Sequence, residues 1–179
     1  MLNGGEKVQS KWVTPRQIEA ILEALTPQNR LACKVSLITG LRINDCLNLK
    51  TEQIQKGRFT VREQKTGKTR RITLPKGLQE EVLRSAGTIY AFENRLNGRR
   101  PRTRQAVFKD LKRASVLFRV GKNVSPHSLR KIYAVSEFGK DHNLKRVQKL
   151  LNHSDEAVTM IYALADQVAK RRNYEIPKS

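Results

Sequence analysis

Residues 57–75, with the sequence GRFTVREQKTGKTRRITLP, decide the fold, because a strand pattern here interrupts an otherwise helical chain. Apolar and polar residues alternate through 57–62 and again through 70–74, which is the period of a half-buried strand. Turn residues at 65–68 join the two strands as a hairpin. With residues 52–55 as a third strand, the pattern predicts a small antiparallel sheet.

On both sides of the hairpin, apolar residues recur at helical spacing. Thr14-Pro15 and Ser125-Pro126 each offer a capping residue followed by proline at the first helical position. Helices are expected at about 15–25, 27–39, 42–49, 77–86, 103–119, 127–139, 143–151 and 155–168. The sequence therefore predicts an α+β fold that is mainly α-helical, with a small antiparallel three-stranded sheet.

The charge of the chain indicates a polyanionic partner. Its 179 residues include 36 Lys and Arg against 16 Asp and Glu, which gives a formal net charge of +20. Each neutralised phosphate releases condensed counterions, so nucleic acid is the favoured partner. A basic ribosomal or membrane-surface protein is the alternative. With 38% hydrophobic and 29% charged residues, the chain is expected to fold as a globular protein in the cytoplasm.

Neither a membrane segment nor a metal site is expected. The sequence has no run of about 18 apolar residues, and its N-terminus lacks the apolar region of a secretory signal. Cys33 and Cys46 lack metal-ligand spacing, and we expect them to be reduced and partly buried. Because the sequence offers neither a carboxylate cluster for Mg²⁺ nor a P-loop, no cofactor is expected.

Two short segments carry residues suited to binding a phosphate. In TGLRIND, residues 39–45, Asp45 follows Arg42 by three positions and can buttress it on one helical face. A surface ion pair of little energetic value is the alternative. In SPHSLR, His127 and Arg130 share one face of a helix start and can converge on one oxyanion. Here the alternative is a solvated helix start with ordinary polar residues.

Further candidates lie at the hairpin turn and near the C-terminus. The segment LLNHSD places His153 just before the last expected helix, which contains Tyr162. A neutral phenol is a weak nucleophile and needs nearby cations or a base, so a core tyrosine with a satisfied hydroxyl is the alternative. Lys65 at the turn can give a proton to a leaving oxygen, or can simply decorate the turn.

Four segments occur in a specific order along the chain: GLRIND, KTGK, HSLR and NHSDEAVTMIYA. In this order and spacing they resemble the tyrosine recombinase family of phage integrases, fimbrial invertases and chromosome-dimer resolvases. The resemblance covers residues 12–165. Asn152 stands where the family usually has glycine, and Lys131 where it often has histidine. Neither position supplies chemistry in the family, so these departures concern local packing.

The resemblance implies how the phosphate is bound. Arg42 and Arg130 look like the two arginines that bind the non-bridging oxygens of the scissile phosphate. Asp45 matches the acid that supports the first of these arginines. Lys65 resembles the hairpin lysine that protonates the departing 5′ oxygen.

The resemblance also implies a nucleophile. His127 matches an acid/base or phosphate-positioning histidine, and His153 matches a histidine that hydrogen-bonds the phosphate. Tyr162, nine residues after His153, falls at the family's spacing for the nucleophile. A 3′-phosphotyrosine conserves the energy of the broken bond, so rejoining needs no ATP. Two arginines, a lysine and two histidines can stabilise the developing charge without a metal.

A run of arginines before the helix expected at 103–119 is expected to hold the DNA backbone without reading its sequence. A loose, solvated loop is the alternative. The residues expected to bind DNA are Arg95, Arg99, Arg100, Arg102 and Arg104, with Lys109, Lys112 and Arg113 on the helix.

The resemblance further predicts how the chain is organised. Residues 1–11 are expected to be a flexible lead-in, 12–165 the catalytic domain, and 166–179 a tail that docks on a neighbouring subunit. Family members usually carry an N-terminal helical domain, so the chain is expected to be an excised fragment or a naturally short member. The expected partner is double-stranded DNA, bound by a homotetramer. This expectation allows for accessory DNA-bending proteins and includes no membrane.

The function that follows from these features is that of a site-specific recombinase from a phage or another mobile element. Two alternatives stay open. One is a non-catalytic DNA-binding protein that keeps the pocket as a phosphate-binding surface, although every candidate catalytic residue is retained. The other is a type IB topoisomerase-like enzyme, which the short length of the chain and the residues of the motifs disfavour.

Overall fold

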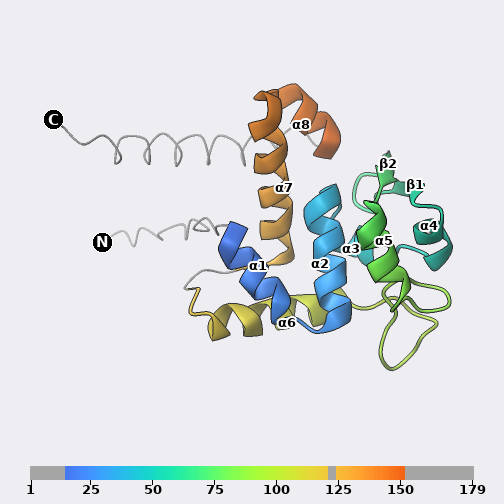
Figure 1. Ribbon diagram of the computed structural model, residues 1–179. Helices are drawn as coiled ribbons and strands as arrows, with labels where there is room; N and C mark the ends of the chain where they lie inside the picture. The colour runs from blue at the N-terminus through green and yellow to red at the C-terminus, as the bar shows by residue number, and fades with distance from the viewer. Residues whose placement is uncertain (1–14, 121–123, 152–179) are drawn as a thin grey trace, which may run out of the picture.

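The computed structural model describes residues 15–120 and 124–151. Figure 1 shows α2 and α7 side by side, α6 across one end of them, and the β-hairpin together with α4 and α5 to one side. In chain order the elements are α1 (Pro15–Glu23), α2 (Pro27–Thr39), α3 (Ile43–Leu47), α4 (Thr51–Gln55), β1 (Arg58–Arg62), β2 (Thr69–Thr73), α5 (Lys76–Leu83), α6 (Arg104–Leu117), α7 (Pro126–Asp141) and α8 (Leu144–Leu151).

The helices expected within the described residues are confirmed, with bounds that shift by a few residues. The helix expected at 42–49 is shorter, because Arg42 has an extended backbone and serves as the N-cap of α3. The helix expected at 155–168 lies outside the described residues. Between α5 and α6 the chain forms a long loop, which contains the isolated β-bridge Glu93↔Pro101.

The sheet has two strands within the described residues, so the expectation of a third strand at 52–55 is wrong. β1 and β2 pair antiparallel, with Phe59 opposite Ile72, as the alternating pattern predicted. Residues 52–55 instead belong to α4, whose first turn is held by a hydrogen bond from the Lys50 N–H to Gln53 Oε1 at 2.9 Å. This segment has one buried apolar residue, Ile54, and no alternation that would fix it as a strand.

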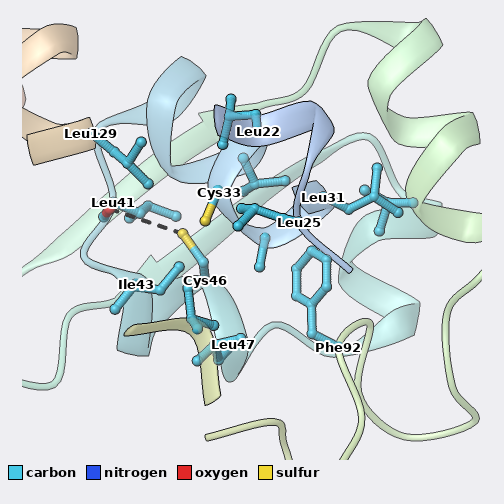
Figure 2. Packing of buried hydrophobic residues seen from close by; sticks show 14 of the residues in the cluster. Leu22, Leu25, Leu31, Cys33, Leu41, Ile43, Cys46, Leu47, Phe92 and Leu129 are labelled. Carbon is cyan, nitrogen blue, oxygen red and sulfur yellow. Dashed lines mark hydrogen bonds between the residues drawn. The ribbon is translucent and has the colours of Figure 1, made fainter. Parts of the chain in front are cut away.

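A single large cluster of apolar side chains from α1 to α7 forms the main core. Cys33 and Cys46 are free thiols with 0% exposure, so they are more deeply buried than the sequence suggested. Figure 2 shows both sulfur atoms inside the cluster, with the Cys46 thiol directed at the Leu41 carbonyl 3.9 Å away. Burial, with a smaller effect of the Asp110 charge, raises the pKa of Cys33 to about 12. Burial also raises the pKa of Cys46, so both thiols stay protonated at neutral pH and serve as core residues.

The close approach of α2 and α7 sets the geometry around the end of α2. Gly40 terminates α2 in the left-handed region, with φ +67°, and its N–H donates to the Ser36 carbonyl at 2.9 Å. A Cβ atom at this position would lie 2.3 Å from Cδ1 of Tyr133 on α7. Glycine is needed here both for the backbone conformation and for space. The chain can then turn directly from α2 into the segment that carries Arg42.

Candidate active site

A pocket of about 420 Å³ gathers side chains from four separate segments of the chain. These segments are the α2–α3 junction, the turn of the hairpin, the start of α6 and the start of α7. The lining residues are Arg42, Ile43, Asn44, Asp45, Gln64, Lys65, Arg104, Pro126, His127 and Arg130. The structure thus brings together Arg42, Lys65, His127 and Arg130, which are four of the six residues expected to be catalytic.

Arg42 enters the pocket from the N-cap position of α3. Its Nη1 donates to Oε2 of Glu63 at 2.6 Å, and the Arg42 side chain is 17% exposed while that of Glu63 is 0% exposed. An isolated carboxylate in the interior would be costly, so Glu63 requires a cationic partner. The ion pair in turn restrains the Arg42 guanidinium at the pocket wall.

Asp45, expected to support Arg42, connects α3 to the hairpin. Its Oδ1 accepts a hydrogen bond from the Gln64 N–H at 3.0 Å. Burial and, more weakly, the charge of Glu63 raise the pKa of Asp45 despite the opposing effects of the Gln64 N–H, Arg42 and Arg130. The charge of Arg42 therefore acts on Asp45, and the hydrogen bond to Asp45 holds Gln64, the residue just before Lys65.

Lys65 is exposed and lines the pocket from the hairpin turn. The turn is closed by two backbone hydrogen bonds, from the Gly67 N–H to the Glu63 carbonyl at 2.8 Å and from the Glu63 N–H to the Lys68 carbonyl at 2.9 Å. Gly67 takes φ +67° without strain. A flexible ammonium group on a fixed turn can reach an oxygen of a ligand in the pocket.

Arg130 is 2% exposed and joins two helix ends. Its Nη1 donates to the carbonyl of Gly40 at the end of α2, and its Nη2 donates to the carbonyl of Leu151 at 2.6 Å. Gly40 is the C-cap of α2, where carbonyl groups lack partners within the helix, and an arginine satisfies its carbonyl well. The contacts hold the Arg130 guanidinium in one orientation beside the pocket.

His127 lies in the first turn of α7, where its side chain is exposed and lines the pocket. The helix begins as the sequence predicted, with Ser125 as N-cap and Pro126 at the first helical position. The Ser125 N–H donates to Ser128 Oγ at 3.2 Å. The N-terminal end of a helix attracts anions, so α7 adds a favourable field to the pocket.

His153 and Tyr162, the remaining two residues expected to be catalytic, lie outside the described residues. Their roles stay predictions. The last described residue, Leu151, accepts the hydrogen bond from Arg130.

The sequence analysis missed Glu63 and Arg70. Oε1 of Glu63 accepts from Arg70 Nη1 at 3.4 Å, and Arg70 Nη2 donates to the Thr39 carbonyl at 2.8 Å. One signal was available, because Glu63 continues the inward positions of Phe59 and Val61 on β1. An acid at an inward strand position needs a buried cation as its partner. The identity of that cation depends on tertiary contacts.

The basic segment splits into exposed and internally bound cations. Arg102 Nε donates to Asn29 Oδ1, and burial, the largest cause, lowers the pKa of Arg102. Arg113 pairs with Asp110 at 2.7 Å and donates to the Ala24 carbonyl, and its side chain is nevertheless 55% exposed. Arg104 lines the pocket. The remaining residues expected to bind DNA have exposed side chains and are Arg95, Arg99, Arg100, Lys109 and Lys112.

Asp110 anchors this segment to the turn between α1 and α2. Its Oδ2 accepts from the Thr26 N–H at 2.9 Å and from Asn29 Nδ2 at 2.7 Å. Burial would raise the pKa of Asp110, but the hydrogen bonds from Asn29, Thr26 and Arg113 outweigh it and lower the pKa. The carboxylate is therefore held in its charged form under the loop.

Positive charge at the pocket comes from the side chains of Arg42, Lys65, Arg104 and Arg130. Across residues 15–120 and 124–151, no group of three or more His, Cys, Asp and Glu side chains could hold a metal ion. None of the helices in this part of the chain is long and apolar enough to span a bilayer.

Comparison with known proteins gives one family. Residues 11–168 match the model of the phage integrase family. The tyrosine recombinase XerA of Pyrococcus furiosus is 29% identical over 168 residues, and a tyrosine recombinase of Thermosipho africanus is 32% identical over 167 residues. Each alignment covers 87% of this chain and 58% of the relative, so the chain spans less than two thirds of these relatives' length.

Solved structures agree in fold. A lambda integrase dimer bound to a COC′ core site has a TM-score of 0.70 and 24% identity, covering 87% of this chain and 60% of that one. A lambda integrase tetramer bound to a Holliday junction has a TM-score of 0.68 and 22% identity, covering 87% and 49%. At this level of identity the likeness establishes the fold of the catalytic domain.

Proposed function

The chain belongs to the phage integrase family, and we propose that it is a site-specific recombinase that cuts and rejoins double-stranded DNA through a covalent 3′-phosphotyrosine. The reaction uses neither metal nor ATP. Its substrate is the DNA of a phage or another mobile element, and it proceeds in the cytoplasm.

One observation carries this proposal. Arg42, Lys65, His127 and Arg130 lie far apart in the sequence and line one pocket. Attack on a phosphodiester builds negative charge on the non-bridging oxygens and on the leaving oxygen. Cations held in place before the reaction stabilise that charge better than water does, and losing one such donor costs about 3–4 kcal/mol.

In the proposed reaction, Arg42 and Arg130 bind the non-bridging oxygens of the scissile phosphate, aided by His153. The hydroxyl oxygen of Tyr162 attacks the phosphorus and its proton passes to His127. As the new O–P bond forms, the bond between phosphorus and the 5′ oxygen breaks, and Lys65 protonates that oxygen. Rejoining is the reverse, in which a 5′ hydroxyl attacks the phosphotyrosine and releases Tyr162.

DNA is bound along a set of exposed cations, which are Arg95, Arg99, Arg100, Lys109 and Lys112. Arg104 connects this surface to the pocket. Arg102 is held by Asn29, whereas Arg113 pairs with Asp110 and keeps a side chain that is 55% exposed and can also contact DNA. We infer assembly into a tetramer on DNA, supported by the lambda integrase tetramer on a Holliday junction.

The direct test is formation of a covalent protein–DNA adduct. Incubation with nicked suicide-substrate DNA in EDTA should give an adduct that resists SDS. Tyr162→Phe should abolish it, because the ring then has no oxygen to form the bond. Tyr174→Phe, a matched control twelve residues further along the chain, should leave the yield unchanged.

Two results would contradict the proposal. An adduct that persists in Tyr162→Phe would assign the nucleophile to another residue. An adduct that appears only when Mg²⁺ is added would overturn the metal-free mechanism.

A further inference from the structure

Glu63 is a buried acid that takes no part in the proposed chemical steps. It comes directly after β1, at the inward position that follows Phe59 and Val61, and its side chain is 0% exposed. A buried ion pair contributes little net stability, because desolvating the charges offsets most of their attraction. Stability alone therefore gives a weak reason for an acid at this position.

The two carboxylate oxygens of Glu63 bind different partners. Oε2 accepts from Arg42 Nη1 at 2.6 Å and from Thr66 Oγ1 at 3.2 Å. Oε1 accepts from Arg70 Nη1 at 3.4 Å. Oε2 thus connects the pocket arginine to the residue beside Lys65, and Oε1 connects both to β2.

These contacts reach the helices that frame the pocket. Arg70 also donates to the carbonyl of Thr39, the last residue of α2. In the opposite direction, Asp45 of α3 accepts from the Gln64 N–H of the hairpin. Two acids therefore connect α3 and the hairpin. Glu63 of the hairpin holds Arg42, and Asp45 of α3 holds the turn that carries Lys65.

We propose that Glu63 is a positioning residue that orients the Arg42 guanidinium toward the scissile phosphate and fixes the hairpin turn that carries Lys65. This inference rests on the proposed function. The carboxylate restricts Arg42 before DNA arrives, so little orientation has to be gained during the reaction. Charge alone would not do this, because arginine acts on phosphate through a directional fork of N–H groups.

The test compares Glu63→Gln with the wild-type chain in single-turnover adduct formation at saturating suicide-substrate DNA. The amide keeps the shape of the side chain and removes its charge. We expect the rate constant to fall about 100-fold, as for a small misplacement of a catalytic group. The DNA dissociation constant should stay within about 2-fold, because many other phosphate contacts determine it.

Glu137→Gln is the matched control. Glu137 pairs with two cations, Lys140 at 2.5 Å and Arg146 at 2.8 Å, on α7 and α8. The substitution makes the same change in charge and also breaks ion pairs, but Glu137 does not line the pocket. Its rate constant should equal that of the wild type.

The amplitude of the reaction separates positioning from stability. If Glu63 only stabilises the fold, Glu63→Gln lowers the melting temperature and the reactive fraction, while the folded fraction reacts at the wild-type rate. That result would overturn the inference. If Glu63→Gln does not fold, Glu63→Asp keeps the charge and draws the carboxylate back from Arg42, so its rate constant should fall about 10-fold. A wild-type rate constant for Glu63→Asp would also overturn the inference.

Failure of the proposed function and failure of the role of Glu63 give different results. A wild-type chain that forms no adduct would remove both the proposed function and this inference. A wild-type chain that reacts, together with Glu63→Gln that reacts equally fast, would remove the role of Glu63 alone.

Discussion

The pocket arginines Arg42 and Arg130 and the arginines of the loop before α6, Arg95, Arg99 and Arg100, carry the same charge in different surroundings. Arg130 is 2% exposed and bound to two helix-end carbonyls, and Arg42 is held by a buried acid. Arg95, Arg99 and Arg100 have exposed side chains. A fixed guanidinium can stabilise charge that develops at one point, whereas mobile ones attract a polyanion of any sequence. We therefore predict that the rate of adduct formation depends on the orientation of the pocket arginines, and that DNA affinity depends on the number of charges on the loop.

The largest loss of activity is expected for Arg42→Ala. Losing a fixed donor should slow adduct formation about 1,000-fold, or about 4 kcal/mol of transition-state stabilisation. Single-turnover kinetics at saturating DNA measure this rate. Arg99→Ala is the control and should react within about 2-fold of the wild type. Equal losses in the two variants would mean that the pocket acts through its net charge.

Gly40→Ala should disturb the frame of the pocket. The new methyl group would meet the Tyr133 ring, and the backbone has φ +67°. We expect a loss of about 3 kcal/mol in the free energy of unfolding, measured by urea denaturation. Gly77→Ala in α5 meets no atom within 4 Å and should instead stabilise the protein by up to about 1 kcal/mol. Wild-type stability of Gly40→Ala would contradict the close contact between α2 and α7.

Asp110→Asn tests the anchor of the loop. Because the folded pKa of Asp110 is lowered, its carboxylate contributes stability above the unfolded pKa of about 3.9, and this contribution is lost as pH falls through the folded value. The variant should lose about 2 kcal/mol at pH 7. Its unfolding free energy should also depend less on pH below about 4. Chemical denaturation from pH 3 to 7 measures both effects, and an unchanged acid dependence would contradict the anchor.

The smallest effect is expected for the exposed arginines. Arg99→Ala combined with Arg100→Ala should weaken binding to all duplexes alike and should flatten the salt dependence by about 0.9 per lost contact. Fluorescence anisotropy at several salt concentrations gives this slope. Arg102→Ala should lower the melting temperature and leave the salt slope nearly unchanged, because Arg102 is bound to Asn29. An unchanged slope in the double variant would show that Arg99 and Arg100 do not contact DNA.

The sequence predicted the helices and the hairpin because their signals are local. Proline after Ser125 sets the start of α7, and the alternation at Phe59 and Val61 sets the face of β1. The prediction of a strand at residues 52–55 is wrong because a single apolar residue, Ile54, defines no period and fits a helix as well as a strand. The helix there depends on the capping contact between Lys50 and Gln53.

The sequence also predicted which cations meet, through the order of the motifs, but not what holds them. Glu63 binds Arg42 from 21 positions away, and Arg130 binds Gly40 from 90 positions away. Arg102 and Arg113 are expected to bind DNA because charge is visible in a sequence, and this stays a prediction. The partner of Arg102, Asn29, lies on α2 and follows from tertiary packing, whereas Arg113 pairs with Asp110 within α6 at a spacing of three residues.

The proposed chemistry requires Arg42 and Arg130 to bind one phosphate together. The most direct measurement is a titration of the full chain with inorganic phosphate, followed by NMR of arginine Nε–H groups assigned with Arg42→Lys and Arg130→Lys. We expect both signals to shift with one dissociation constant, and either substitution to weaken phosphate binding at the arginine that remains. Two different constants, or a shift of one signal alone, would contradict it.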